Sequence, residues 1–212
     1  MSLTIKSSGE GNFIQVPTGM HLARCYRIVD LGTQKTEYMG QVRYLPKVML
    51  QFEIHSENDK GEPLQTTEGK PLILSKTYTA SNSERSNLIK DLQTWRGKEF
   101  SESERKQASI IAVIGQWGMI NVVETENNGR TYTNISSINP VPAAIKKNGL
   151  PQAVNPEVIF NLDDFNEEIF NSFSEGIQNK IKQSTEWSHI GSGASQNASV
   201  AGFDDMENDL PF

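Results

Sequence analysis

Alternating hydrophobic and polar residues predict three β-strands in the first 80 positions. Residues 20–29, with the sequence MHLARCYRIV, form the first strand, and Leu31-Gly32-Thr33 predicts the bend that ends it. Range 42–54 carries hydrophobic residues at every second position in its second half, which is typical of a half-buried strand. A polar loop with glycines and prolines is predicted over 55–71, and a third strand over 72–79.

A helix is predicted after the third strand. Ser81 and Glu84 have the spacing of a capping box, in which both side chains bind free amide groups of the first turn. Gly97 can end the helix in a left-handed conformation. The hydrophobic face of this helix consists of Leu88, Leu92 and Trp95.

A second short helix and a β-hairpin follow. Ser101 and Glu104 repeat the capping spacing before 110–114, which is predicted to be a short helix or a buried connector. Strands over 117–126 and 130–138 flank an Asn-Asn-Gly turn, in which glycine supplies a positive φ at low cost.

The order of these elements predicts the fold class. Three strands, a helix and two strands is the order of the OB-fold, a five-stranded Greek-key barrel with a helix between strands 3 and 4. We therefore expect a mainly β domain of this type over residues 1–147. An SH3-like barrel or a small mixed sandwich would give a similar pattern.

The last third of the sequence has a different composition. Residues 148–187 are predicted to form an acidic amphipathic helical extension, because hydrophobic residues recur every four positions. Residues 188–203 are rich in Gly, Ser, Ala, Gln and Asn, which predicts a flexible linker. Residues 204–212, DDMENDLPF, form an acidic tip. The recurring hydrophobic residues are Phe165, Ile169, Phe173, Ile177 and Ile181.

Charge divides the chain at the same place. Residues 1–147 carry 18 Lys and Arg against 15 Asp and Glu, a net charge of +3. Residues 148–212 carry 2 against 11, a net charge of −9, and the whole chain has −6. A basic body with an acidic end is expected of a protein whose body binds a polyanion.

The sequence offers no catalytic or metal-binding motif. Cys25 has no second cysteine for a disulfide, and the three histidines are widely spaced, so no zinc site is predicted. No nucleophile has a recognisable base, and no glycine-rich segment has the lysine of a phosphate loop. We therefore expect a protein that is not an enzyme and uses no cofactor. It has no apolar stretch of membrane-spanning length and no signal peptide, so a cytoplasmic location is expected.

Aromatic and basic residues interleave in the predicted strands. Unpaired DNA bases stack on flat rings, each worth about 1–3 kcal/mol, while cations bind the phosphates. Tyr26, Tyr78 and Tyr132 each lie two residues from a basic residue, so each pair is predicted to share one strand face. The candidate residues for binding single-stranded DNA (ssDNA) are Arg24, Tyr26, Arg27, Arg43, Tyr44, Lys47, Lys76, Tyr78, Trp117, Arg130 and Tyr132.

The acidic tip resembles the C-terminal tip of bacterial and phage single-stranded-DNA-binding proteins, in which acidic residues precede a Leu-Pro-Phe or Ile-Pro-Phe end. This resemblance implies that the tip docks in a basic-rimmed apolar pocket of replication, recombination or repair proteins in a bacterial host cell. The residues expected to bind these partners are Asp204, Asp205, Glu207, Asp209, Leu210, Pro211 and Phe212.

A second resemblance covers most of residues 1–187. Segments 30–34, 76–81 and 91–98 resemble small phage-encoded replication-region proteins. The sequence thus predicts a phage-type protein, monomeric or homo-oligomeric, that coats ssDNA with little sequence preference. The alternatives are a recombination mediator or annealing accessory protein on the same barrel, and a small DNA-metabolism enzyme such as a nuclease.

Overall fold

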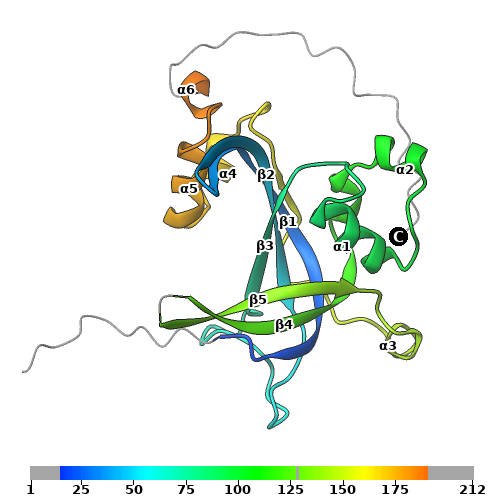
Figure 1. Cartoon of the computed structure of the whole chain (residues 1–212). Helices are drawn as coiled ribbons and strands as arrows, with labels where there is room; N and C mark the ends of the chain where they lie inside the picture. Colours follow the sequence, from blue (N-terminus) through cyan, green and yellow to red (C-terminus); the bar gives the residue numbers. More distant parts are fainter. Residues whose placement is uncertain (1–14, 128, 191–212) are drawn as a thin grey trace, which may run out of the picture.

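The computed structural model describes residues 15–127 and 129–190 and is mainly β (Figure 1). A six-stranded sheet forms its centre, and short helices lie on two sides of it. The strands are β1 (Gly19–Tyr38), β2 (Gln41–Ile54), β3 (Ile73–Thr79), β4 (Trp117–Asn127), β5 (Arg130–Asn139) and β6 (Val158–Phe160). The helices are α1 (Asn87–Arg96), α2 (Glu102–Gln107), the 3-10 helix η1 (Ile110–Val113), α3 (Ala143–Asn148), α4 (Glu167–Asn171), α5 (Glu175–Lys182) and α6 (Trp187–Ile190).

The strands follow the order β3-β2-β1-β4-β5 with antiparallel pairing, and β6 pairs with β1 in parallel. The two ends of this path lie close together, because Lys76 Nζ of β3 donates a hydrogen bond to the Ser136 carbonyl of β5 at 3.1 Å. α1 follows β3 in the chain and packs against both β3 and β5. The predicted succession of three strands, a helix and a two-stranded hairpin is confirmed.

β1 is longer than the sequence predicted. Leu31-Gly32-Thr33 was expected to end the strand, and this expectation is wrong, because β1 continues to Tyr38. Gly32 has φ +67°, and the pairing with β2 shifts register between Asp30 and Gly32. Such a β-bulge bends a strand without ending it, and glycine inside a strand often marks one.

Hydrophobic side chains form clusters on both faces of β1 and β2, as expected where successive side chains point to opposite sides. On the face toward α1, Trp95 packs against Phe52 with ring centroids 5.7 Å apart. Trp95 is therefore a core residue, as its place on the helix predicts. On the other face, Val29 and Met49 are covered by Phe160, Phe170 and Phe173.

The ends of the helices test the capping predictions. The N-cap of α1 is Ser86, so the capping box predicted at Ser81 is wrong. Gly97 ends α1 with φ 73°, as predicted. The capping box at Ser101 and Glu104 is confirmed at the start of α2.

Residues 150–190, which we call the C-terminal segment, do not form one amphipathic helix. The helical extension predicted over 148–187 is found only in part: α4 and α5 lie in its second half, but β6 precedes them and no single continuous helix forms. The chain turns at Phe173 between α4 and α5, and this turn brings Phe170, Phe173 and Ile181 into one cluster with Phe160 of β6. Residues 188–190, predicted as linker, belong to α6, while 191–203 and the acidic tip lie outside the described residues.

Hydrogen bonds fasten the C-terminal segment to β1. Thr33 donates from its amide and its hydroxyl to the Glu186 carboxylate, at 2.8 and 2.6 Å. The Thr185 amide donates to the Thr33 carbonyl at 3.1 Å. Burial alone would raise the pKa of Glu186, but its hydrogen bonds, chiefly those from Thr33, outweigh it and lower this pKa.

We expect Gly32→Ala to destabilise the fold at this contact. A β-carbon at Gly32 would lie 2.6 Å from Ser184 Cβ and 2.7 Å from Leu162 Cδ1, and a left-handed backbone costs a residue with a β-carbon about 1–2 kcal/mol. Denaturant titration should show at least this loss in the free energy of unfolding. Gly176→Ala is the matched control, because Gly176 lies in α5 with open space around it, so the helix should gain up to about 1 kcal/mol. Equal stability of the two variants would contradict the close packing of Gly32 against Ser184 and Leu162.

Candidate nucleic-acid interface

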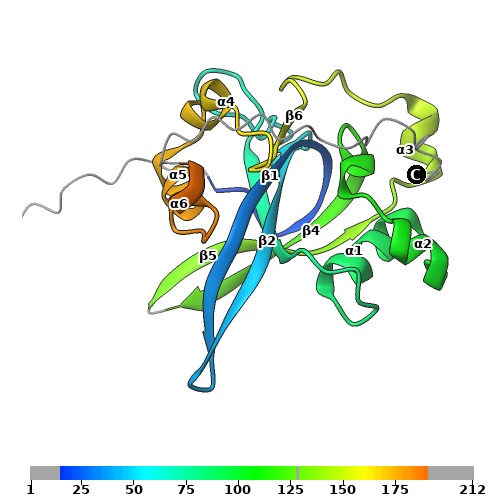
Figure 2. The same ribbon diagram turned by 90° about the horizontal axis from the view of Figure 1, so that it is seen from above.

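A two-stranded arm projects from the sheet (Figure 2). Residues 33–46, which we call the arm, form the distal parts of β1 and β2. The pairing of β1 with its other neighbours ends at Val29, and that of β2 with β3 ends at Lys47. From Gly32 and Lys47 outward, the two strands pair with each other in regular register up to Tyr38 and Gln41.

Aromatic and basic side chains are exposed on this arm. Tyr38 and Tyr44 have 69% and 58% of their surface exposed, and Lys35 and Arg43 are exposed as well. Lys35 pairs with Tyr44, so these two share one face of the arm. Arg43 pairs with Thr36, two residues from Tyr38, so Arg43 and Tyr38 share the other face. Each face therefore carries one ring and one cation.

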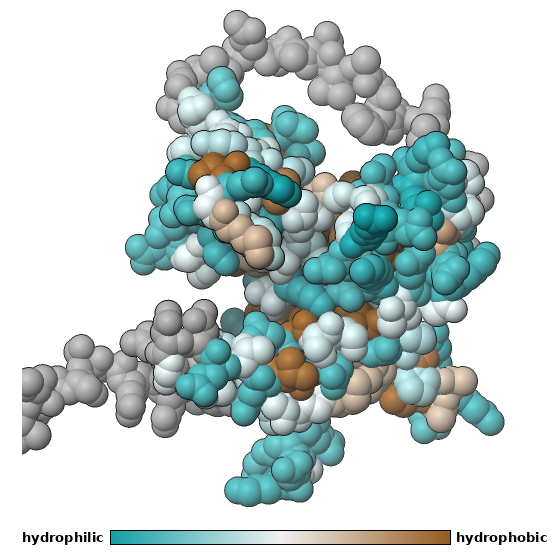
Figure 3. Space-filling model, viewed as in Figure 1, coloured by the Kyte–Doolittle hydropathy of each residue, from teal (hydrophilic) through white to brown (hydrophobic). Residues whose placement is uncertain are grey.

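The base of the arm continues into a polar row on β3. Lys47 Nζ donates to Thr79 Oγ1 at 2.8 Å. Ser75 and Thr77 lie on the same face of β3 as Thr79 and are exposed. β3 runs between the C-terminal helices and the β4–β5 hairpin in Figure 1, and Figure 3 shows the surface hollowed there. Hydroxyl and ammonium groups beside a hollow are suited to contact a phosphate backbone.

Arg24 is buried, which corrects its prediction as a DNA-binding residue. Its guanidinium binds Glu53 Oε1 at 3.2 Å, the Asn155 carbonyl at 3.1 Å and the Glu157 carboxylate. Glu53 is itself fully buried and accepts two hydrogen bonds from Asn155, both at 2.7 Å. Burial alone would raise the pKa of Glu53, but its hydrogen bonds, chiefly those from Asn155, outweigh it and lower this pKa. Arg24 thus joins the sheet to the C-terminal segment.

Lys76 and Tyr78 share one strand face, as predicted, but this face is turned toward α1. Lys76 Nζ and the Tyr78 hydroxyl both bind Asp91 Oδ2 of α1, at 2.5 and 2.7 Å. Burial raises the pKa of the Tyr78 hydroxyl, and the neighbouring Asp91 carboxylate raises it further. Both residues are engaged within the fold and are withdrawn from the candidate interface.

We expect Asp91→Asn to cost about 1.5–3 kcal/mol of unfolding free energy, the usual value of hydrogen bonds to a charged group. The substitution keeps the shape of the side chain but removes the charge that pairs with Lys76. Thermal denaturation followed by circular dichroism checks this value. Asp59→Asn, in the exposed loop after β2, is the control and should stay within about 0.5 kcal/mol of the original protein.

Three further candidates also pack within the fold. The pairing of β1 with β2 skips Tyr26 at a β-bulge, and the Tyr26 side chain is buried. The Arg27 guanidinium lies over the rings of Tyr26 and Phe173, 5.2 and 5.3 Å from their centroids. The Trp117 ring packs on His55 with centroids 4.9 Å apart.

Four of the predicted residues lie on the arm, at its base or on the β4–β5 hairpin. Arg43 and Tyr44 lie on the arm, Lys47 at its base, and Tyr132 is half-exposed on the β4–β5 hairpin. The Arg130 side chain lies outside the described residues. Sequence reasoning missed Lys35 and Tyr38, because it ended the first strand too early. The β-branched Thr33 and Thr36 and the aromatic Tyr38 favour a strand, and they were the signal that could have extended it.

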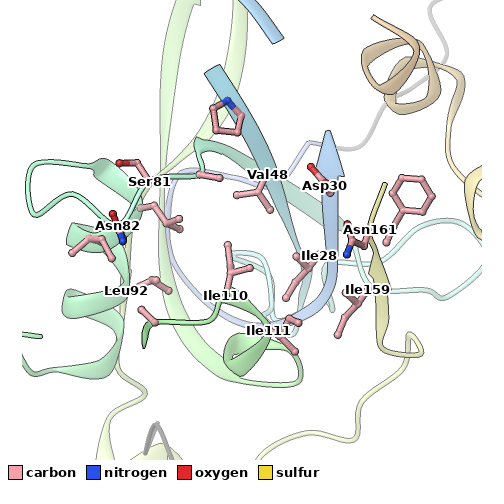
Figure 4. Close-up of a pocket in the computed structure, with 16 residues that line it drawn as sticks. Ile28, Asp30, Val48, Ser81, Asn82, Leu92, Ile110, Ile111, Ile159 and Asn161 are labelled. Carbon is pink, nitrogen blue, oxygen red and sulfur yellow. The ribbon is translucent and has the colours of Figure 1, made fainter. Parts of the chain in front are cut away.

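An apolar cavity of about 740 Å³ lies between α1, η1 and β6 and reaches Pro46 at the base of the arm (Figure 4). Ile28, Ile110 and Ile159 are among the aliphatic side chains that line it. Asp30 also lines it, and burial raises the pKa of this carboxyl. An aliphatic cavity with a carboxyl at its wall is unsuited to a polyanion, so the arm is the better candidate interface.

Within residues 15–127 and 129–190, no group of three or more His, Cys, Asp and Glu side chains is placed to hold a metal ion. In the same residues, no helix has the length and apolar character to span a membrane. No protein-family model matches this chain, and no curated protein matches its sequence. The fold and the arm are therefore the basis for a functional proposal.

Proposed function

We propose that this chain is a phage-type ssDNA-binding protein that coats exposed strands during replication or recombination with little sequence preference. The observation that carries this proposal is the arm, each face of which carries one exposed tyrosine and one exposed cation, beside a polar strand face. Aromatic rings and cations along one path are what sequence-tolerant binding of ssDNA requires, because every base can stack and every nucleotide has a phosphate.

The strand arrangement supports an OB-fold as the framework. In that fold, ligands lie across strands 2 and 3, between the loop joining strands 1 and 2 and the loop joining strands 4 and 5. The order β3-β2-β1-β4-β5, with β3 and β5 close together and α1 between β3 and β4 in sequence, agrees with such a barrel. The arm is the connection between strands 1 and 2, and Tyr132 lies on the hairpin of strands 4 and 5.

We propose that the acidic tip recruits replication, recombination or repair proteins. This part of the proposal rests on the resemblance of DDMENDLPF to the tip of known ssDNA-binding proteins. Its acidic residues would steer an encounter with a basic partner, and Leu210 and Phe212 would enter an apolar pocket. The proposal assigns the chain a binding role without catalysis or cofactor.

Fluorescence anisotropy with a labelled oligo-dT strand in EDTA tests the proposed function. We expect magnesium-independent binding that weakens steeply as salt rises, because bound cations release counterions from the phosphates. The oligonucleotide should stay intact. Binding that is undetectable at low salt, or cleavage of the strand after magnesium is added, would contradict the proposal.

A further inference from the structure

Met39 occupies an unusual position at the tip of the arm. It forms the two-residue turn between β1 and β2 together with Gly40, and both have positive φ, 50° and 72°. Among residues 15–127 and 129–190, Met39 is the one non-glycine residue with positive φ. Such turns favour Asn-Gly, because a methionine side chain has no compensating local hydrogen bond in a left-handed backbone.

The same side chain is 84% exposed, so it makes little contact with the fold. Tyr38 beside it and Val42 across the turn are exposed as well, which gives the arm an apolar end. Packing does not explain a strained and exposed methionine. Strain of this kind is typical of positions whose side chain acts on a ligand.

The charge of the arm indicates what this ligand is. Behind the apolar end, Lys35 and Arg43 are exposed, and Lys47 lies at the base. Glu37 is the acidic residue between them. A cationic shaft with an apolar end is complementary to DNA, because phosphates line its outside and bases fill its inside.

We propose that the arm ends in a wedge, in which Met39 inserts beside the last base pair where a single strand enters a duplex. This inference rests on the proposed function and adds a second DNA structure, the junction, to it. Apolar side chains, methionine among them, insert between base steps and unstack them. Lys35 and Arg43 would hold the flanking phosphates, while Tyr44 stacks on the single strand next to the junction.

Met39→Asn is the variant that isolates the wedge. Asparagine readily adopts the left-handed conformation at the turn position before glycine. The arm should therefore keep its shape, and the melting temperature of the protein should not change. Met39→Gly is a second variant with the same expectation. Both remove the apolar side chain from the tip and leave the tyrosines and cations of the arm in place.

The experiment uses a short duplex with a dT overhang and 2-aminopurine, which fluoresces when unstacked, in the last base pair. The original protein should raise this fluorescence, and both variants should lose most of the rise while binding free oligo-dT as tightly as before. An equal rise with the variants would overturn the wedge. The wedge would also be overturned if Met39→Asn changed the oligomeric state seen in sedimentation and this change explained the lost fluorescence. The tip would then bind a second copy of the chain. If no form of the protein binds free oligo-dT, the proposed function fails instead.

Discussion

Replacing Arg24 with Ala should lower the free energy of unfolding by about 3–5 kcal/mol, the cost of breaking a buried ion pair by removing one partner. Glu53 is fully buried beside Arg24 and would keep its charge without the guanidinium that balances it. The segment around Asn155 and Glu157 would also lose its hydrogen bonds to Arg24. Denaturant titration measures this loss.

Arg43→Ala is the matched control, because Arg43 is an exposed arginine on the same two paired strands. It should change the stability by no more than about 0.5 kcal/mol. Arg24→Ala is thus expected to lower stability, whereas Arg43→Ala is expected to leave stability unchanged and to affect only DNA binding. An Arg24→Ala protein that is as stable as the original and only binds oligo-dT more weakly would show that Arg24 contacts DNA after all.

The double variant Arg43→Ala with Tyr44→Ala should bind oligo-dT much more weakly. Loss of one stacked base costs about 1–3 kcal/mol, which raises Kd about 5- to 150-fold, and loss of a phosphate contact adds to this. The slope of log Kd against log salt should also fall by about 1, the value expected for the loss of one phosphate contact. Both substituted side chains are exposed, so the melting temperature should hold.

Lys70→Ala is the control for this binding experiment. Lys70 is an exposed cation in the loop between β2 and β3, away from the arm. Its loss changes the net charge as Arg43→Ala does, so a general effect of charge would appear in both variants. Equal affinity of the double variant and the original protein would exclude the arm as the binding surface.

More of the fold than of the candidate site could be predicted from the sequence. Period-two hydrophobic residues in β2 and the Asn-Asn-Gly sequence between two predicted strands are local signals, and β2, β4 and β5 were found where predicted. The capping box at Ser101 and Glu104 is also local. The same reasoning missed the turn between α4 and α5, because hydrophobic residues four apart fit two short helices joined by a turn as well as one long helix.

The candidate site required the tertiary structure. An arginine in a strand has the same local pattern whether it faces water, as Arg43 does, or a buried carboxylate from another strand, as Arg24 does. Lys76 and Tyr78 both bind Asp91 of α1. Their spacing along β3 does not predict this contact. Tyr26 and Tyr44 both lie in strands beside basic residues, yet Tyr26 is buried and Tyr44 is exposed.

Photo-cross-linking maps the surface that contacts DNA most directly. An oligo-dT strand that carries 5-iodouracil is irradiated in complex with the full chain, and the cross-linked peptides are identified by mass spectrometry. Cross-links should fall on Tyr38 and Tyr44 of the arm, because stacked rings lie against the bases. Cross-links that spare residues 33–46 and fall on α1 and α2 would contradict the account.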